Sequence, residues 1–389
     1  MTEVLAGPLR SVRAASGQDA REVNRRSVLH AVASGAAVTR ADLARLTGLT
    51  RPTVSSLIDQ LVTEGLVIEV GQGISAGGKR PTLLAIDAGA RQVIAVDVSS
   101  DPVVAVLSDL GGTEIASRHL PDALHGDDLV DALATVIAGL ADAATAPLAG
   151  VGVGTPGLVD ADGTVVEAPN LGWHDRPLGR ELRARTGLPV WVANDADAAA
   201  LVEFGRLPEE RDGLVLVRIG VGVGAGLVLG GRPYPGGRAA AGEIGHLVVV
   251  PDGPACSCGN RGCLETVAGL RPILAAGGLD PAHPPADLTT LLDAGGDAVG
   301  DALEVAATHL GAVVAHLVAI LDVADVVLSV EVAGLGEVLA EQVGAVVRQR
   351  LLPRLAEDVR VRSAADADGL VLDGAHALVL AGSLGMVRP

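Results

Sequence analysis

The sequence predicts an N-terminal winged helix-turn-helix domain followed by an α/β body that contains a structural zinc site. Three observations lead to this fold class. Residues 1–86 show helical periodicity and then two short strands, and strands alternate with helices in the rest of the chain. All three cysteines of the 389-residue chain lie within residues 256–263, and this density indicates a metal site.

The length and composition fit a protein of several domains without a membrane segment. A chain of 389 residues is long for one core, so two or three domains are expected. With one Phe, one Tyr and two Trp, the core must be built from Ala, Val and Leu. We find no leader pattern and no uncharged apolar run of about 18 residues. We therefore expect a cytoplasmic protein with reduced thiols and no membrane partner.

The net charge of −18 is distributed unevenly along the chain. Residues 1–86 contain 10 Lys and Arg against 7 Asp and Glu, whereas the remainder contains 19 against 40. A mildly basic N-terminal part on an acidic body indicates that only this part meets a polyanion.

Periodicity and glycine positions predict the first two helices. Residues 1–19 mix Gly, Ser, Pro and charge, and we expect them to form a flexible arm. Helical spacing of small and apolar residues follows over residues 21–33. A second helix is predicted over residues 40–46, with Leu43 and Leu46 facing inward.

A third helix and a wing complete the N-terminal domain. The third helix follows a glycine-containing turn; Thr50 caps it, and Arg51 begins it. Such a pair of helices is a helix-turn-helix, whose second helix presents its first residues to base edges. Residues 66–70 and 79–86 are predicted to be the strands of a wing. The predicted DNA contacts are polar and basic residues of these elements: Arg40, Thr50, Arg51, Thr53, Ser55, Ser56, Gln60, Lys79 and Arg80.

A helical interaction module that never binds DNA is the alternative for this domain. The polar face of the third helix, the basic end of the wing loop and the local positive charge favour DNA binding over that alternative.

The body alternates between strands and helices. A hairpin of buried strands is expected at residues 93–98 and 103–108. Alternating elements predict an α/β fold with functional sites at the carboxyl ends of strands. The further elements that we predict are helices over 129–144, 194–204, 299–320 and 337–351, and strands over 149–153, 189–192, 214–219, 227–229 and 325–330.

Four residues of the body have the ligand types of a closed zinc site. Cys256, Cys258 and Cys263 form a Cys-x-Cys-x4-Cys pattern, and His246 precedes them by ten residues. A tetrahedral structural zinc site needs four such ligands, and four protein ligands leave no open position for catalysis. Glycines within the pattern would let the thiolates converge. Three buried thiols without a metal are the alternative.

Polar residues gather at strand ends and around this pattern. Asn194 and Asp195 follow a predicted strand, while Glu243 and Glu265 lie within three residues of proposed metal ligands. Carboxylates, an amide and an imidazole on a rigid scaffold suit a polyhydroxyl ligand, because sugar hydroxyls both donate and accept hydrogen bonds. The alternative for an Asp at a strand-to-helix junction is a helix cap.

Several of these motifs together resemble the ROK family (repressor, open reading frame, kinase). The resemblance covers the chain from about residue 24 to residue 385. It rests on the winged helix-turn-helix and on five segments: GVGTPGLVD at 152–160, PNLGW at 169–173, NDADAAALVEFG at 194–205, GEIGH at 242–246 and CSCGNRGCLE at 256–265.

The resemblance implies an organisation and a sugar site. It implies an arm at 1–19, a winged helix-turn-helix at 20–87 and a ROK body at 88–389 with a two-lobed, actin-like ATPase fold. The lobes would divide near residue 205, the C-terminal helix would return to the first lobe, and homodimers or homotetramers would form. The implied sugar-binding residues are Gly157, Asn194, Asp195, Glu243, His246 and Glu265.

Three departures from the family's kinases argue against ATP chemistry. The first phosphate loop lacks its glycines and reads Asp97-Val98-Ser99-Ser100-Asp101-Pro102, the second has Val221 in place of a threonine, and the adenine-side glycine pair is replaced by Ser329-Val330-Glu331. We therefore predict no catalytic residues, although Asp195 matches the position of the kinase base.

The predicted function is a sugar-responsive transcriptional regulator, a repressor, that binds a pseudo-palindromic operator. Two alternatives remain at this point. One is a sugar kinase with an accessory DNA-binding domain, and the other is a constitutive DNA-binding protein that no longer binds a sugar.

Overall fold

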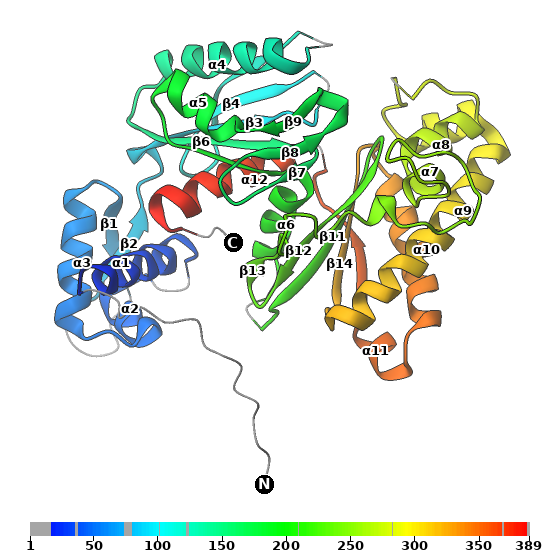
Figure 1. Ribbon diagram of the computed structural model, residues 1–389. Helices are drawn as coiled ribbons and strands as arrows, with labels where there is room; N and C mark the ends of the chain where they lie inside the picture. The colour runs from blue at the N-terminus through cyan, green and yellow to red at the C-terminus, as the bar shows by residue number, and fades with distance from the viewer. Residues whose placement is uncertain are drawn as a thin grey trace. The chain divides into compact units, whose positions relative to one another are not determined.

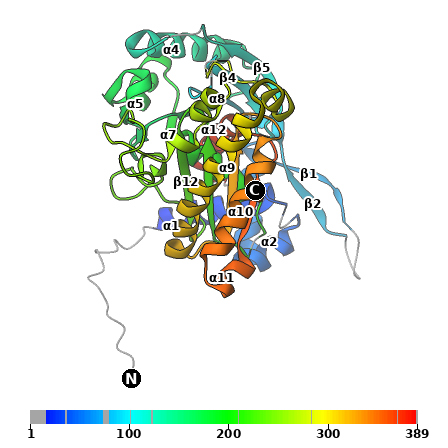
Figure 2. The same ribbon diagram turned by 90° about the vertical axis from the view of Figure 1, so that its right-hand side faces the viewer.

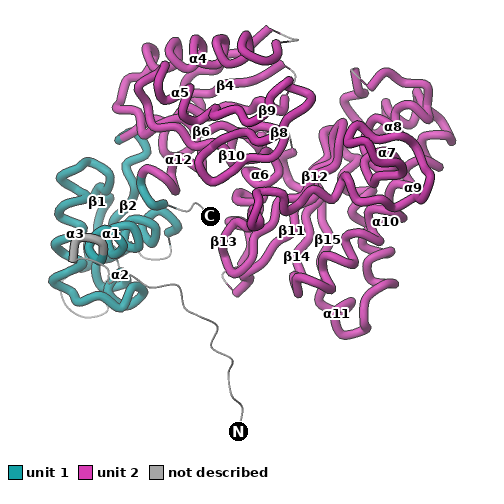
Figure 3. The backbone as a smooth tube through the Cα atoms, viewed as in Figure 1, with its two compact units in different colours: residues 1–90, 384–388 teal, residues 91–383, 389 magenta. Residues whose placement is uncertain are grey.

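The computed structural model describes residues 17–35, 38–73, 80–100, 102–121, 124–208, 210–281, 283–367 and 369–386. The chain divides into two compact units (Figure 3). Residues 1–90 with 384–388 form unit 1, and residues 91–383 with 389 form unit 2. Most of the predicted arm, the predicted DNA contact Lys79, and Asp101 of the first phosphate loop lie outside the described residues.

Unit 1 is a winged helix-turn-helix, as predicted. The side chains of Thr39 and Thr50 cap α2 and α3, each accepting a hydrogen bond from a backbone N–H three residues on. Between these helices Gly48 has a φ of +69°, a conformation that favours glycine. The two strands pair antiparallel as a ribbon (Figure 2). The elements are α1 (Gly17–Ala33), α2 (Arg40–Thr47), α3 (Arg51–Thr63), β1 (Val67–Gln72) and β2 (Thr82–Ile86).

The small core of unit 1 differs from the prediction at two inward positions. Leu43 is buried as expected, and so are four of the five residues expected in the apolar stripe of α3: Val54, Leu57, Ile58 and Leu61. The fifth, Val62, is 39% exposed, and Leu46 of α2 is 55% exposed. Leu43 fills the inner side of α2, and the helix ends one residue after Leu46, so its last turn faces outward.

The first lobe of unit 2 is a five-stranded sheet with helices on both faces (Figure 1). The strand order is β10-β6-β3-β4-β5, and the first three strands are parallel. The predicted hairpin is confirmed as the antiparallel pair β3 and β4. α4 (Gly126–Asp142) and α5 (Leu178–Thr186) pack on one face, and α12 (Leu370–Val379) packs on the other. The strands are β3 (Gln92–Asp97), β4 (Val104–Asp109), β5 (Glu114–His119), β6 (Leu148–Thr155) and β10 (Val190–Asn194).

The second lobe repeats this plan with the strand order β13-β12-β11-β14-β15. α9 (Leu288–Leu321) and α10 (Leu335–Arg350) cover one side of its core, and α6 (Asp195–Gly205) packs on β11 and β12. The strands are β11 (Gly213–Ile219), β12 (Val223–Leu229), β13 (Arg232–Pro233), β14 (Asp325–Val330) and β15 (Arg360–Ser363). Smaller elements are β7 (Leu158–Val159), β8 (Val165–Ala168), β9 (Trp173–Arg176), α7 (Glu265–Ala268), α8 (Leu270–Ala276) and α11 (Pro353–Asp358).

Helices α6 and α12 lie between the two sheets and pack closely through glycine. A Cβ on Gly152 of β6 would lie 1.9 Å from the carbonyl oxygen of Ala375 in α12. A Cβ on Gly374 of α12 would similarly lie 2.3 Å from the carbonyl of Ala198 in α6. Between α6 and the second sheet, a Cβ on Gly226 of β12 would lie 2.1 Å from the carbonyl oxygen of Ala196 in α6. The four layers therefore touch backbone to backbone, and their spacing depends on the absence of side chains.

Helix α9 is longer than predicted because it includes a break. It begins at Leu288, and Gly296 interrupts it with a φ of +58° and a ψ of −152°. By length and composition this helix could cross a membrane, but half of its most apolar window is buried inside the protein. Val299, Leu303, Leu310 and Val314 face the core of the second lobe, so α9 is a core helix.

Candidate metal centre and ligand site

The four predicted metal ligands converge. The ligand atoms of His246, Cys256, Cys258 and Cys263 all lie within 4.8 Å of one another. The Sγ atoms of Cys258 and Cys263 are 3.7 Å apart, and Sγ of Cys256 lies 3.5 Å from Nδ1 of His246. Tetrahedral zinc with ordinary bond lengths would give about 3.8 Å for sulfur to sulfur and about 3.5 Å for sulfur to nitrogen. The donor set therefore fits a tetrahedral metal, and the sulfur separation excludes a disulfide.

Two glycines shape the cysteine loop, as the sequence predicts. Gly259 has a φ of +90° and Gly262 a φ of +71°. A Cβ on Gly262 would lie 1.6 Å from the carbonyl oxygen of Val250. The backbone N–H of Cys256 donates to the carbonyl of Asn260 at 2.9 Å and closes the turn. The loop thus holds its cysteines through backbone contacts that only glycine allows.

The ring of His246 joins the cluster to two carboxylates. Its Nδ1 faces Cys256 and lies 3.7 Å from Oε1 of Glu265, while its Nε2 lies 3.8 Å from Oε2 of Glu243. Oε1 of Glu265 is also 2.9 Å from Sγ of Cys256. One ring nitrogen is therefore available to a metal, and the other faces Glu243 away from the cysteines.

Asn194 connects two predicted site segments. Its Oδ1 accepts hydrogen bonds from the N–H groups of Ala196 and Asp197 at 2.9 and 3.2 Å and so caps α6. Its Nδ2 donates to the carbonyl oxygen of Gly157 at 3.0 Å. The sequence allowed Asp195 to be only a helix cap, but the side chain that caps α6 is that of Asn194. Asp195, the first residue of the helix, has a different partner.

That partner is Arg218, a residue that the sequence reasoning did not single out. Nε of Arg218 donates to Oδ2 of Asp195 at 3.1 Å, and Nη2 donates to Oε1 of Glu331 at 3.0 Å and to Oγ of Ser99 at 3.2 Å. Burial lowers the pKa of Arg218, but Asp195 and Glu331 outweigh it and the pKa is raised. A charged residue within the apolar strand Gly213–Ile219 was the signal available in the sequence.

The surroundings of Asp195 are acidic. Burial raises the pKa of Asp197 to about 7, and the charge of Asp195 adds to this effect. Burial also raises the pKa of Glu243, with His246 acting against it and the charges of Asp195 and Glu265 adding to it. These interactions place Asp195, Glu243, Glu265 and His246 in one electrostatic neighbourhood.

The predicted DNA contacts fall into two groups in unit 1. Thr50, Arg51 and Ser56 are exposed at the start of α3 or along it, Thr53 and Ser55 are half-buried, and Arg80 is exposed beyond the helix. Arg40, however, pairs with Asp59 at 2.7 Å and Glu69 at 3.5 Å. Gln60 accepts from Arg21 of α1 and donates to Glu64. Arg40 and Gln60 thus have intramolecular partners.

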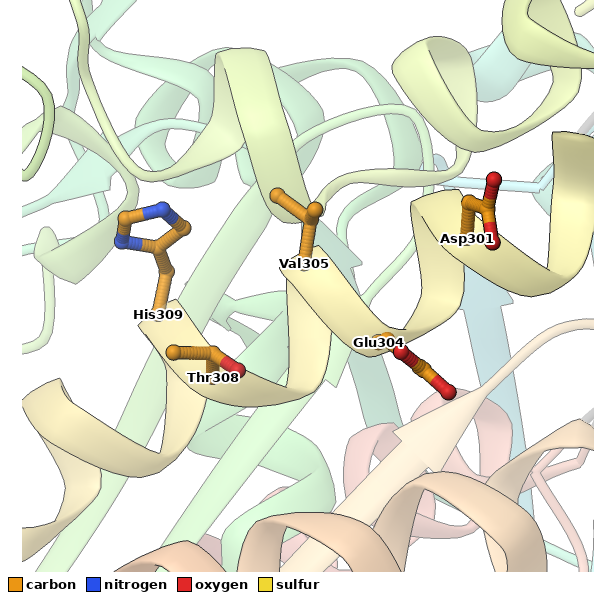
Figure 4. Close-up of a pocket in the computed structure, with 5 residues that line it drawn as sticks. All are labelled: Asp301, Glu304, Val305, Thr308 and His309. Carbon is orange, nitrogen blue, oxygen red and sulfur yellow. The ribbon is translucent and has the colours of Figure 1, made fainter.

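Two surface hollows lie away from the predicted ligand residues. The first is lined by Asp301, Glu304, Val305, Thr308 and His309, which all come from α9 (Figure 4). Because a single helix supplies every side chain, no polar groups from different elements converge there. The second lies in unit 1 between α1 and α3, where Arg21 and Asn24 stand beside Thr53 and Ser56. Arg21 also donates to Gln60 of α3 at 3.3 Å.

Fold and site together define a winged helix-turn-helix protein whose body has the two-lobed architecture of sugar kinases. The ROK family model matches residues 93–381, and a MarR family model matches residues 23–73. The chain therefore belongs to the ROK family.

Regulators resemble this chain over most of its length. The xylose repressor of Bacillus subtilis is 34% identical over 65% of this chain and 67% of its own. The DNA-binding transcriptional dual regulator NagC of Escherichia coli is 28% identical over 92% of each chain. A crystal structure of a ROK family transcriptional regulator, a homologue of E. coli Mlc, has a TM-score of 0.79 at 24% identity and covers 95% of this chain and 98% of its own. That structure confirms the predicted fold.

Sugar kinases resemble a smaller part of this chain. The glucokinase of Streptomyces coelicolor is 35% identical over 46% of this chain and 57% of its own. Relatives that match more than 90% of this chain include xylose repressors and the regulator NagC, so the chain is a transcriptional regulator of the ROK family. These regulators also support the prediction that the chain is not a kinase.

Proposed function

We propose that this regulator is a repressor that binds operator DNA through residues 20–87 and a sugar through residues 88–389, in the cytoplasm. One observation carries the proposal. Glu243 and Glu265 lie beside His246, and the charge of Asp195 acts on Glu243, while Arg218 pairs with Asp195 and Glu331 next to the segments that match phosphate loops. The proposed sugar-binding residues are thus present, whereas the loops that would bind the phosphates of ATP are altered.

We assign zinc to the four-residue cluster. Three thiolates and one imidazole are ligands that zinc prefers, and four of them complete a tetrahedral structural site. When bound, zinc would supply rigidity and no catalytic water. His246, the cysteines and the glycine turns would then hold Glu243 and Glu265 at one geometry.

The proposed sugar site has a distinct task for each side chain. The second lone pairs of the Asp195 oxygens can accept from sugar hydroxyls, because Arg218 and the N–H of Ala196 use one each. Glu243 and Glu265 offer further acceptors, and Nε2 of His246 faces the same side as Glu243. Asn194 keeps one N–H beyond its bond to Gly157. Several acceptors with few donors suit a ligand rich in hydroxyl hydrogens.

For DNA, we propose that α3 enters the major groove with its N-terminal turn leading. Thr50, Arg51, Thr53, Ser55 and Ser56 would then contact bases or phosphates. Arg21 and Asn24 of α1 would add contacts at the neighbouring backbone. A homodimer or homotetramer would place two such helices on the halves of a pseudo-palindromic operator.

The coupling between the two events would run through α6. Asp195 is the first residue of α6, and that helix packs on β12 and on α12 through backbone-close contacts. A sugar that hydrogen-bonds to Asp195 and shifts it would therefore also shift α6, which is packed between the lobes. The sugar changes operator affinity only to the extent that it binds the two states unequally.

A combined binding and turnover experiment tests the proposal. Duplexes selected from a random pool by the full-length protein supply the operator, and fluorescence anisotropy follows binding while D-xylose, D-glucose and other sugars are added. We expect one sugar to weaken operator binding at least tenfold. Sugar-dependent ADP release at an ordinary enzymatic rate would instead identify a kinase, and operator binding that no sugar alters would contradict sensing.

A further inference from the structure

The segment matching the first phosphate loop is already occupied by a carboxylate. Oδ1 of Asp97 accepts hydrogen bonds from the N–H of Ser99 at 2.8 Å, the hydroxyl of Ser99 at 2.6 Å and the N–H of Ser100 at 3.2 Å. Asp97 is 3% exposed. Backbone N–H groups in the segment that matches a phosphate loop therefore bind the carboxyl group of Asp97, whose pKa is raised by its burial.

A carboxylate also lies against the glycine-rich turn on the opposite lobe, here by close approach to a glycine. The carboxylate of Glu331, at the end of β14, lies over Gly220. A Cβ on Gly220 would be 2.7 Å from Oε1 of Glu331 and 3.4 Å from its Oε2. The close approach that a glycine offers to a phosphate is thus used by a second internal anion.

A cation lies between these two anions. Arg218 is 11% exposed and donates to Glu331 and to Ser99, whose hydroxyl in turn donates to Asp97. Its Nε holds Asp195 at 3.1 Å. Two carboxyl groups, of Asp97 and Glu331, thus lie on two loops around the guanidinium of Arg218. Nucleotide phosphates with their counter-ion have the same alternation of charge. The contacts of Arg218 also join the two lobes.

The balance of charge around Arg218 is negative. Asp97, Asp195 and Glu331 all act on its guanidinium. Glu243 and Glu265 lie further along the same neighbourhood, on either side of the His246 ring. A phosphate ester next to Asp195 would bring two more negative charges to a site whose guanidinium already serves carboxylates.

We propose that Arg218, Glu331 and Asp97 form an internal substitute for a nucleotide's phosphates and counter-ion, and that this substitute restricts the effector to an uncharged sugar. The inference rests on the proposed sugar-sensing function and specifies its ligand. Arg218 is a positioning residue here, because it acts on the sugar through Asp195. The sensor needs no nucleotide, since the two loops are held together without one.

Isothermal titration calorimetry with the full-length protein tests this specificity. The probes are D-xylose and D-glucose, D-xylose 5-phosphate and D-glucose 6-phosphate, each with and without magnesium and a non-hydrolysable ATP analogue. We expect at least one free sugar to bind and its phosphate ester to bind at least 100-fold more weakly. The nucleotide analogue should change the affinity for the sugar less than twofold.

Variants of Arg218 test its positioning role. Arg218→Met should weaken sugar binding at least tenfold, and Arg218→Lys should restore part of the loss because the positive charge remains. Arg180→Met, at an exposed arginine of α5, is the matched control and should bind as the wild type does. Thermal unfolding of each variant separates a lost interaction from a lost fold.

Each other outcome has a definite meaning. An ester that binds as tightly as its free sugar overturns the internal substitute and leaves sugar sensing intact. A nucleotide analogue that strengthens sugar binding tenfold would also overturn the internal substitute and leave sugar sensing intact. A folded Arg218→Met variant with unchanged sugar affinity would have the same meaning. If none of the sugars or esters binds, the proposed function fails, and the inference that rests on it fails too.

Discussion

The metal cluster lies beside Glu243 and Glu265, the Arg218 network includes Asp195, and the two regions are built in opposite ways. The four ligands of the cluster lie within residues 246–263 and converge through one glycine-shaped loop. The Arg218 network joins four separate segments, the loop after β3, the start of α6, the strand β11 and the end of β14. The first is a property of local sequence, and the second exists only once both lobes have folded.

The two regions also differ in energy. A structural zinc site contributes on the order of 10 kcal/mol in small metal peptides. A buried ion network contributes little net stability, because the cost of removing charges from water offsets their attraction. We therefore expect the cluster to give the site its rigidity and the network to give it specificity.

The largest expected effect is the loss of a metal ligand. Cys258→Ser removes one of the three thiolates among the four ligands, so the protein should lose its metal and its sugar affinity should fall at least 100-fold. The α/β body should stay folded, because Cys258 is exposed and most residues of the two large cores lie outside the cysteine loop. Elemental analysis by mass spectrometry, circular dichroism and sugar titration measure the three properties.

Arg261→Gln is the control for this variant, since Arg261 is exposed in the same loop and is not among the four ligands. It should keep both metal and sugar response. A Cys258→Ser protein that retained zinc and responded normally would show that the ligand assignment is wrong.

The same contrast explains what the sequence revealed. The caps Thr39 and Thr50, the hairpin of β3 and β4, and the cysteine cluster were predictable, because neighbours in sequence determine them. Arg218 was missed, since its partners lie 23 to 119 residues away. The ion pairs of Arg40 were not predictable either, because Asp59 and Glu69 lie 19 and 29 residues away in the sequence.

A second prediction separates the two regions through the layers between the lobes. Gly152→Ala places a methyl group 1.9 Å from the carbonyl of Ala375 and must push α12 away from β6. Overpacking of this kind costs about 1–3 kcal/mol. The free energy of unfolding, measured in urea, should fall by that amount. Sugar affinity should fall with it, while metal content stays unchanged.

Gly139→Ala is the matched control for that variant. A Cβ at this position of α4 would meet nothing within 4 Å. The substitution should raise stability by about 0.5–1 kcal/mol, because alanine favours a helix more than glycine does. A Gly152→Ala protein that lost its metal would instead indicate that the cluster depends on the spacing of the lobes.

The smallest expected effect concerns Asp197, which lies between the two regions. Its pKa is raised from 3.8 to about 7, chiefly by burial and then by Asp195. The folded state therefore binds more protons than the unfolded state between about pH 4 and pH 7. Because of this group, stability should fall as the pH rises through that window and stay level above it.

Asp197→Asn removes this slope while its side-chain oxygen can still accept the hydrogen bond from Leu227. One unit of pKa corresponds to about 1.4 kcal/mol, and partial contact with water reduces the effect, so we expect a difference of about 1–2 kcal/mol. Urea unfolding at pH 5 and pH 8 should show the variant gaining more stability over the wild type at pH 8 than at pH 5. Asp293→Asn, at an exposed site on α9, should leave the pH dependence unchanged. Equal slopes for wild type and Asp197→Asn would mean that Asp197 is ionised throughout, and that the acidic neighbourhood tolerates a further charge.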